Sequence, residues 1–214
     1  MRDTPRLHLD AEGLTIGIVT SCYHDEITSR LREGAISAFV DAGGNPDDIY
    51  EVPAAGAFEV IPLVDALARK EVDGVVALGC IIRGETTHDE HLARSIASML
   101  GRIAFEHEVG IGFGILTCLS TEQAMDRAGG LKGNKGEEAM NAVIATARGL
   151  QMIEEDLEDL PPSEEESEES ELLGDEGDGE EYEEVVYEDD VEEGEGEDAD
   201  DDGEYEYEYE EEEH

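Results

Sequence analysis

Residues 74–80 read Gly-Val-Val-Ala-Leu-Gly-Cys, an apolar run without a charged side chain. A short apolar run of this kind predicts a strand buried on both faces, as in a parallel sheet. Residues 14–20 and 110–117 have the same character, and residues 49–52 form a shorter run that ends at Pro53. We therefore expect four strands of a parallel sheet.

The segments between these runs have apolar residues at helical spacing, which predicts an amphipathic helix in each. Strands that alternate with helices imply right-handed crossovers, and hence an α/β fold with helices on both faces of the sheet. Ligands bind such sheets at the carboxyl ends of the strands, which here directs attention to the loops at 21–25, 53–59, 81–88 and 118–120. The expected helices lie at residues 25–41, 61–69, 92–103 and 121–128, with a last one that starts near 140 and continues through Leu160 to a stop at Pro161 and Pro162.

The charge divides the chain into unequal parts. The 214 residues contain 59 acidic and 13 basic side chains, for a formal net charge of -46. All 13 basic and 23 of the acidic residues lie within residues 1–151, which gives 13 - 23 = -10 for that part and leaves 36 acids for the rest. We expect an N-terminal arm (1–13), a folded domain (14–151) and an acidic tail (152–214) too polar to offset the entropy of ordering.

Several classes of protein are disfavoured by composition. The chain has no apolar run of about 18 residues, so we expect no membrane span, and we expect no secretory signal at its start. No basic cluster points to nucleic acid. The cysteines Cys22, Cys80 and Cys118 are odd in number and widely spaced, which favours reduced thiols and a cytoplasmic location. No zinc-type pairing of Cys or His is present, so we expect no metal.

The densest cluster of reactive residues is Ile81-Ile-Arg-Gly-Glu-Thr-Thr-His88, which follows a predicted strand and opens a predicted helix. The amides at a helix start bind phosphate well, and Gly84 permits a tight turn. His88 would lie beside such an anion with a side chain suited to proton transfer. The alternative is ordinary capping, because Thr86 with Asp89 and Thr87 with Glu90 both have capping-box spacing.

Two further clusters are weaker on their own. Residues 127–136 combine Arg127, Lys132 and Lys135 with several glycines, which suggests an anionic ligand or simply a helix that ends at glycine. In Gly56-Ala-Phe-Glu59 the flat face of Phe58 and the carboxylate of Glu59 would suit a polar heteroaromatic ring. The alternative for that segment is a helix start with a core phenylalanine.

Taken in order, five short motifs resemble the 6,7-dimethyl-8-ribityllumazine synthase family, and the resemblance covers about residues 14–150. The motifs are Gly56-Ala-Phe-Glu59, Gly79-Cys-Ile-Ile-Arg-Gly-Glu-Thr-Thr-His88, Phe113-Gly-Ile-Leu-Thr117, Glu122-Gln-Ala-Met-Asp-Arg-Ala-Gly129 and Asn134-Lys-Gly136. The resemblance implies a three-layer, flavodoxin-like α/β sandwich with a four-stranded parallel sheet. It also implies a reaction, the condensation of 5-amino-6-(D-ribitylamino)uracil with 3,4-dihydroxy-2-butanone 4-phosphate, with no cofactor and no metal.

The resemblance further implies a role for individual residues. His88 would be the general acid and base, and Arg127 would bind the phosphate together with the turn formed by Gly84, Glu85 and Thr86. Phe113, Lys135, Glu138 and Arg127 would come from the neighbouring subunit of a pentamer. The residues implied to contact the pyrimidine and ribityl groups within one subunit are Tyr23, Ala57, Phe58, Glu59, Ile81 and Ile82.

The chain departs from the family pattern at several places. The first loop reads Cys22-Tyr23-His24 where arginine, an aromatic residue and asparagine are usual, and residues 52–62 form a longer segment than usual. His88 is followed by Asp89-Glu90-His91 where an aromatic, an acidic and an aromatic residue are common. Such departures leave a non-catalytic shell or scaffold as the alternative function. A lumazine-dismutating enzyme is disfavoured by the phosphate-binding residues, and a flavodoxin-type carrier by a first loop without a hydroxyl-rich cradle.

The family contains pentamers and shells of twelve pentamers, and the short linker at 129–133 resembles the shell-forming type. In such a 60-subunit shell the tails would concentrate their negative charge. One hypothesis is that the tail recruits a cationic partner or cargo, and the alternative is that it only aids solubility.

Overall fold

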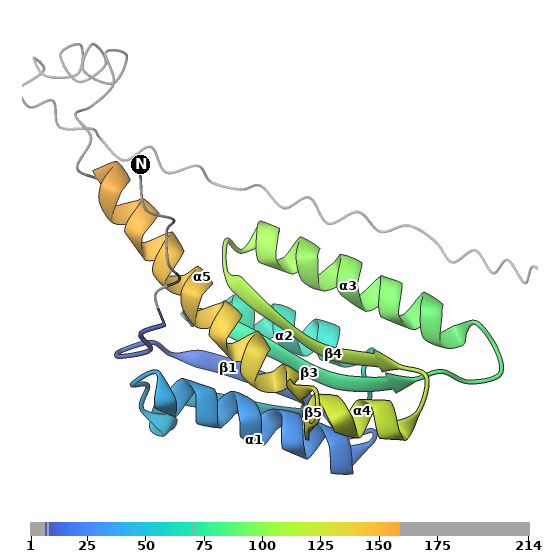
Figure 1. Ribbon diagram of the computed structural model, residues 1–214. Helices are drawn as coiled ribbons and strands as arrows, with labels where there is room; N and C mark the ends of the chain where they lie inside the picture. Colours follow the sequence, from blue (N-terminus) through green and yellow to red (C-terminus); the bar gives the residue numbers. More distant parts are fainter. Residues whose placement is uncertain (1–6, 8, 71, 159–214) are drawn as a thin grey trace, which may run out of the picture. The chain divides into compact units, whose positions relative to one another are not determined.

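The computed structural model describes residue 7, residues 9–70 and residues 72–158. Its central element is a parallel sheet of four strands in the order β2-β1-β3-β4, of which β1, β3 and β4 are labelled in Figure 1. This confirms the sheet predicted from the apolar runs. The strands are β1 (Ile16–Ser21), β2 (Ile49–Ala54), β3 (Gly74–Ile82) and β4 (Gly110–Cys118).

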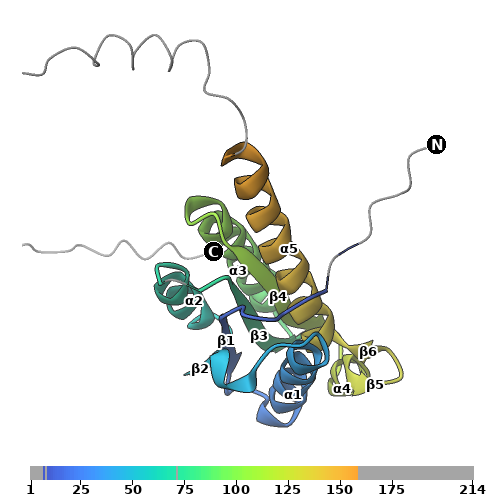
Figure 2. The same ribbon diagram turned by 90° about the vertical axis from the view of Figure 1, so that its left-hand side faces the viewer.

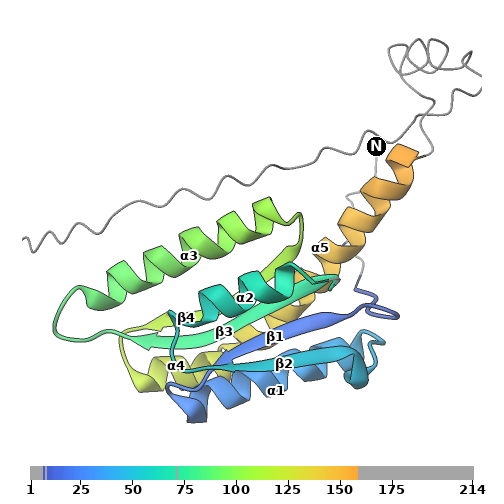
Figure 3. The same cartoon turned by 180° about the vertical axis from the view of Figure 1, so that it is seen from behind.

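Helices cover both faces of the sheet and make the fold a three-layer α/β sandwich. One face carries α2 (Val60–Ala68) and α3 (His88–Glu106), which lie side by side in Figure 3. The other face carries α1 (Asp25–Asp41), α4 (Thr121–Arg127) and α5 (Lys135–Glu158). Among the described helices, none has both the length and the apolar character needed to cross a bilayer.

The hydrophobic core consists of two layers, one on each side of the sheet. Val76, Leu78 and Cys80 of β3 pack toward α1 and α5. Val75 and Ala77 alternate with them and pack toward α2 and α3. Because both faces of β3 are covered, its sequence is continuously apolar rather than alternating.

Some element bounds differ from those predicted. β2 continues through Pro53, because this strand lies at the edge of the sheet and proline is tolerated there. α3 begins at His88, as expected from the placement of this residue in the first turn of the helix, although the apolar spacing starts only at Leu92. Residues 128–134 form a small antiparallel pair, β5 (Ala128–Gly130) and β6 (Gly133–Asn134), beside α4 (Figure 2). A single turn of 3-10 helix, Pro46–Asp48, precedes β2.

The last helix begins at Lys135 and runs through Glu158, so the predicted continuation is confirmed as far as the described residues extend. Leu160, Pro161, Pro162 and the rest of the acidic tail lie outside them. Residues 152–158, which the charge pattern assigned to the tail, are the last turns of α5.

α1 and α5 approach closely at the start of α5. A side-chain carbon placed on Gly136 would lie 1.9 Å from the backbone oxygen of Leu31. Asn134 fixes this contact, since its amide nitrogen donates to the carbonyl of Arg30 at 2.8 Å and its amide oxygen accepts from the Gly136 amide at 2.8 Å. Glycine is therefore required where the two helices meet.

Part of the predicted N-terminal arm is attached to α5 by Arg148. Its guanidinium donates to the backbone oxygen of Asp10 at 2.8 Å and to that of Glu12 at 2.5 Å. Ala11, between them, is fully buried. Residues 10–12 thus pack as part of the domain.

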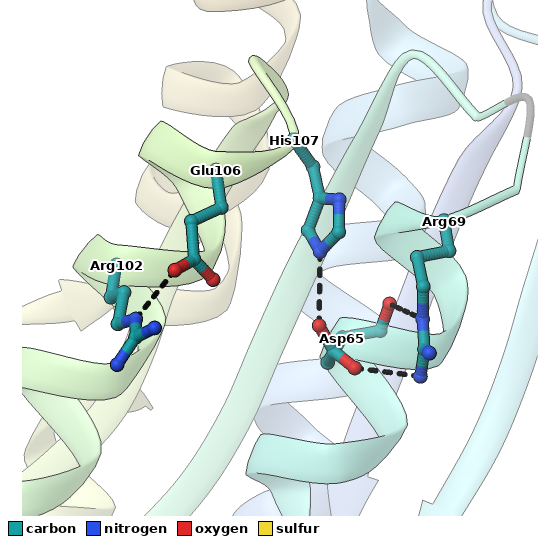
Figure 4. A network of polar contacts seen from close by, with 5 residues as sticks. All are labelled: Asp65, Arg69, Arg102, Glu106 and His107. Carbon is teal, nitrogen blue, oxygen red and sulfur yellow. Dashed lines mark hydrogen bonds and ion pairs between the residues drawn. The ribbon is translucent and has the colours of Figure 1, made fainter.

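A polar contact joins α2 to the end of α3 (Figure 4). The ring nitrogen Nε2 of His107, the residue after α3, lies 2.9 Å from the Asp65 carboxylate on α2. The same carboxylate pairs with Arg69 at 2.7 Å, whereas the nearby pair of Arg102 and Glu106 is more exposed and lies within one helix.

Candidate active site

A cavity of about 750 Å³ opens at the carboxyl ends of β1 and β3, between the starts of α2 and α3. This is the edge at which parallel α/β sheets bind ligands. Nine of the residues predicted from the sequence line it: Tyr23, Ala57, Phe58, Glu59, Ile81, Ile82, Gly84, Thr86 and His88. Further residues that line the cavity were not predicted from the sequence, including His24, Cys80, Asp89, His91, Leu92 and Ser95.

The loop before α2 is held against the sheet at Gly79. A side-chain carbon on Gly79 would lie 2.9 Å from the Ile115 side chain and 3.7 Å from the Ala57 side chain. Ala57 is buried there, while Phe58 is 52% exposed and Glu59 is the residue that precedes α2. Phe58 is therefore not the core residue of the alternative interpretation, and its flat face is available to a ligand.

The first loop has an unusual backbone at His24. This residue has φ 60° and ψ 45°, in the left-handed region, and it immediately precedes α1. Asparagine and histidine are among the few residues other than glycine that adopt this conformation readily. The His24 ring packs edge-on against Tyr23, with ring centres 4.7 Å apart. Histidine therefore suits the left-handed backbone at this position.

The start of α3 lacks the predicted capping box. Thr87 precedes the helix without a capping hydrogen bond from its side chain. The Thr86 hydroxyl accepts from the His88 amide at 3.4 Å, a long contact, and the Asp89 oxygen Oδ1 has no partner within the described part of the chain. Neither predicted capping box is therefore present among the described residues, and the long contact of Thr86 with the His88 amide is what remains of the capping alternative. His88 is exposed at the cavity wall, where a ligand could reach its ring.

The second predicted cluster, in residues 127–136, does not contribute to the cavity. Arg127 ends α4, on the face of the sheet opposite α3, and donates to the Gln123 carbonyl at 2.9 Å. Lys135 pairs with Glu138 at 2.5 Å at the start of α5, and Phe113 is a half-exposed residue of β4. The cavity lining includes none of the predicted residues Arg127, Lys135, Glu138 and Phe113, and it does not include Glu85. Among the described lining residues there is no lysine or arginine.

The family model for 6,7-dimethyl-8-ribityllumazine synthase matches residues 13–151, which is more than half of the chain. The chain belongs to the 6,7-dimethyl-8-ribityllumazine synthase family. Membership makes it an enzyme of riboflavin biosynthesis, and the sandwich described above is the flavodoxin-like fold expected of the family.

Individual relatives agree with this assignment. A 6,7-dimethyl-8-ribityllumazine synthase of Thermus thermophilus is 40% identical over 146 residues, which cover 68% of this chain and 93% of the relative. The enzyme of Aquifex aeolicus is 41% identical over 140 residues, covering 65% and 91%. That of Corynebacterium kroppenstedtii is 43% identical over 148 residues, covering 68% and 91%.

The buried thiols at and near the cavity are poor nucleophiles. All three cysteines are free, and Cys80 and Cys118 are buried on neighbouring strands. Burial raises the pKa of Cys80 to about 12, with a smaller contribution from Cys118. Burial also raises the pKa of Cys118, which the charge of Arg127 partly opposes. Because only the thiolate is a good nucleophile, neither thiol is suited to covalent catalysis.

Proposed function

We propose that the cavity condenses 5-amino-6-(D-ribitylamino)uracil with 3,4-dihydroxy-2-butanone 4-phosphate to 6,7-dimethyl-8-ribityllumazine, with release of phosphate and water. The main support for this proposal is the set of side chains that line the cavity. Exposed aromatic rings of Tyr23 and Phe58, the carboxylate of Glu59 and the ring of His88 line one cavity at the ligand-binding edge of the sheet.

The proposed reaction needs proton transfer more than any other chemistry. Imine formation between the pyrimidine amine and the ketone releases one water, elimination releases phosphate, and ring closure onto the remaining carbonyl releases a second water and gives the lumazine. No electron is gained or lost overall. His88 would accept and return the protons, and Tyr23 and Phe58 would hold the pyrimidine ring. Glu59 would accept hydrogen bonds from ribityl hydroxyls, while Ala57, Ile81 and Ile82 would shape the pocket.

The phosphate requires positive charge that the described residues of the cavity do not supply. A phosphate is best held by charge-assisted hydrogen bonds, and no described lining residue is lysine or arginine. We infer that Arg127 of a neighbouring copy supplies this charge, beside the turn of Gly84, Glu85 and Thr86. Phe113, Lys135 and Glu138 of that copy would complete the pyrimidine pocket.

This arrangement would make the protein an oligomer with sites between subunits. We propose a pentamer, and the short hairpin connection between α4 and α5 is compatible with assembly of pentamers into a 60-subunit shell. The free thiols agree with a cytoplasmic location, where cysteines stay reduced. Nothing in the site favours a non-catalytic scaffold, since the residues implied for catalysis are present.

The acidic tail has a separate proposed role in binding a cationic partner or cargo. Its 36 acidic residues without lysine or arginine supply the required charge. A chain that ends at residue 158 should capture fewer basic proteins than the full chain at low salt, and the difference should vanish at high salt. Equal capture by both chains would show that the tail does not recruit partners.

The function itself is tested by mixing the two substrates with the full chain and following lumazine absorbance and fluorescence. We expect turnover that Arg127→Ala reduces by about a hundredfold or more, mainly through weaker binding of the butanone phosphate. Lys132→Ala removes a cation of the same cluster that we assign no role, and it should leave turnover unchanged. Absence of lumazine from correctly assembled wild-type protein would contradict the proposal.

A further inference from the structure

Asp89 places a carboxylate at a buried position of α3, where the other buried residues are apolar. The buried side chains of α3 are Asp89, Ile96, Leu100 and Ile103, so the aspartate continues the stripe that packs on the sheet. It is only 7% exposed. Its oxygen Oδ1 is sealed from solvent and has no hydrogen-bond partner, and within the described residues it is the one buried side-chain nitrogen or oxygen in that condition.

A carboxylate in such a position is unfavourable unless it receives a hydrogen bond. The apolar side chains of Ala57, Ile81 and Leu92 line the same cavity and offer none. The other titratable lining groups are Tyr23, Glu59, Cys80 and the rings of His24, His88 and His91, and no hydrogen bond or ion pair joins any of these described groups to Asp89. None of the described residues supplies the missing donor, and because Asp89 lines the cavity, rotation of its carboxylate would turn the sealed oxygen toward a group bound there.

The residues that line the cavity indicate which kind of molecule would donate a hydrogen bond to Asp89. Asp89 lines the same space as the exposed aromatic faces of Tyr23 and Phe58, which suit a flat heterocycle. With Glu59 it gives this space two carboxylates and no lysine or arginine among the described residues. Carboxylates accept hydrogen bonds from amines and hydroxyls, whereas they repel a phosphate dianion. Of the two proposed substrates, only the aminopyrimidine presents ring and exocyclic N–H groups.

We propose that Asp89 is a substrate-binding residue that accepts a hydrogen bond from an N–H or O–H group of the aminopyrimidine. It thereby determines which of the two substrates fills this part of the cavity. The assignment rests on the proposed function and deepens it. It also accounts for an acidic residue at a position where the family pattern has an aromatic one.

The test compares Asp89→Leu, Asp89→Asn and Glu90→Gln in the full, assembled chain. Leucine continues the apolar stripe, and asparagine keeps an acceptor oxygen without the charge. Glu90 is the matched control, because it lies in the same turn but faces Arg94, 3.8 Å away, rather than the cavity. Calorimetry measures the Kd of 5-amino-6-(D-ribitylamino)uracil, and steady-state kinetics measures KM for each substrate.

We expect Asp89→Leu to weaken binding of the aminopyrimidine about tenfold or more while KM for the butanone phosphate does not rise. Asp89→Asn should weaken it less, and Glu90→Gln should not change it. Asp89→Leu should also raise the melting temperature of the ligand-free protein, because a buried charge without a partner is removed. A merely structural role predicts the change in melting temperature without the change in Kd.

The outcomes separate this inference from the proposed function. Unchanged Kd in both Asp89 variants overturns the inference even if the wild type forms lumazine. Wild-type protein that binds the aminopyrimidine without forming lumazine contradicts the function alone, and the Asp89 comparison still decides the inference. Wild-type protein that binds no aminopyrimidine contradicts both. If Asp89→Leu does not assemble, Asp89→Asn carries the comparison.

Discussion

At the scale of single residues, the cavity wall combines the exposed aromatic rings of Tyr23 and Phe58 with the buried carboxylate of Asp89. His88, Phe58 and Glu59 were predictable because each lies in a short motif after a strand, where ligands bind. Asp89 was not, since an acidic residue in the first turn of a helix is normally a solvated capping or dipole-stabilising group. Its seven-residue spacing to Ile96 was the available signal that it faces inward.

The pKa of Cys80 gives a prediction at this scale. The thiol has a pKa of about 12 in the fold, against 9.0 for a free cysteine, because it is buried. Below pH 9 the thiol is protonated in both the folded and the unfolded chain, so its ionisation does not lower the free energy of unfolding. Between about pH 9 and 12 only the unfolded chain ionises, and the free energy of unfolding should fall by up to about 1.4 kcal/mol per pH unit.

Urea denaturation at several alkaline pH values measures this effect as a difference between variants. Cys80→Ala should reduce the alkaline loss of stability, and Cys22→Ser, which changes an exposed cysteine, should not. Parallel curves for wild type and Cys80→Ala would show that the buried thiol is not responsible.

At the scale of elements, the strands and most helices followed from apolar spacing, while contacts between elements did not. Apolar spacing alone cannot show that α3 begins at His88, since the residues of its first turn are all polar, including the buried Asp89. It also cannot reveal β5 and β6, which are rich in glycine and have no apolar alternation. Both features depend on tertiary packing, which overrides local preference.

The contact between α1 and α5 predicts a large difference between two glycines of the same helix. Gly136→Ala would place its side chain 1.9 Å from the Leu31 carbonyl, a backbone atom that cannot rotate away, so the helices must separate. We expect a loss of about 3 kcal/mol or more, as for other severe overpacking. Gly149→Ala meets no atom within 4 Å and should stabilise the protein by up to about 1 kcal/mol. Thermal denaturation of both variants measures this, and equal effects would contradict the packing described.

The link between α2 and α3 predicts a second contrast, drawn in Figure 4. His107 is 23% exposed and joins two helices through Asp65, whereas Arg102 is 66% exposed and pairs within α3. His107→Ala should cost about 1–2 kcal/mol of stability, since it leaves a half-buried carboxylate with one partner fewer. Arg102→Ala should cost at most about 0.5 kcal/mol. Chemical denaturation compares the two, and a larger loss for Arg102→Ala would refute the assignment.

At the scale of the whole molecule, the sequence identifies the parts of the site without showing how they meet. Apolar runs and motifs placed His88 and Arg127 at loops of one domain. The structure places them at opposite faces of the sheet, His88 at the start of α3 and Arg127 at the end of α4. Local patterns carry no information on subunit contacts, so a site completed by a second copy has to be inferred from what one copy lacks.

The separation of His88 and Arg127 within one chain predicts complementation between inactive variants. If each site joins His88 of one subunit to Arg127 of the next, chains with only one of these residues replaced are inactive alone but can complement each other. Dissociating and reassembling equal amounts of His88→Ala and Arg127→Ala chains would create sites with both residues intact at about one subunit boundary in four. About a quarter of wild-type activity should return, and none should return if each chain completes its own site. Two defective alleles expressed together would then support growth that neither supports separately.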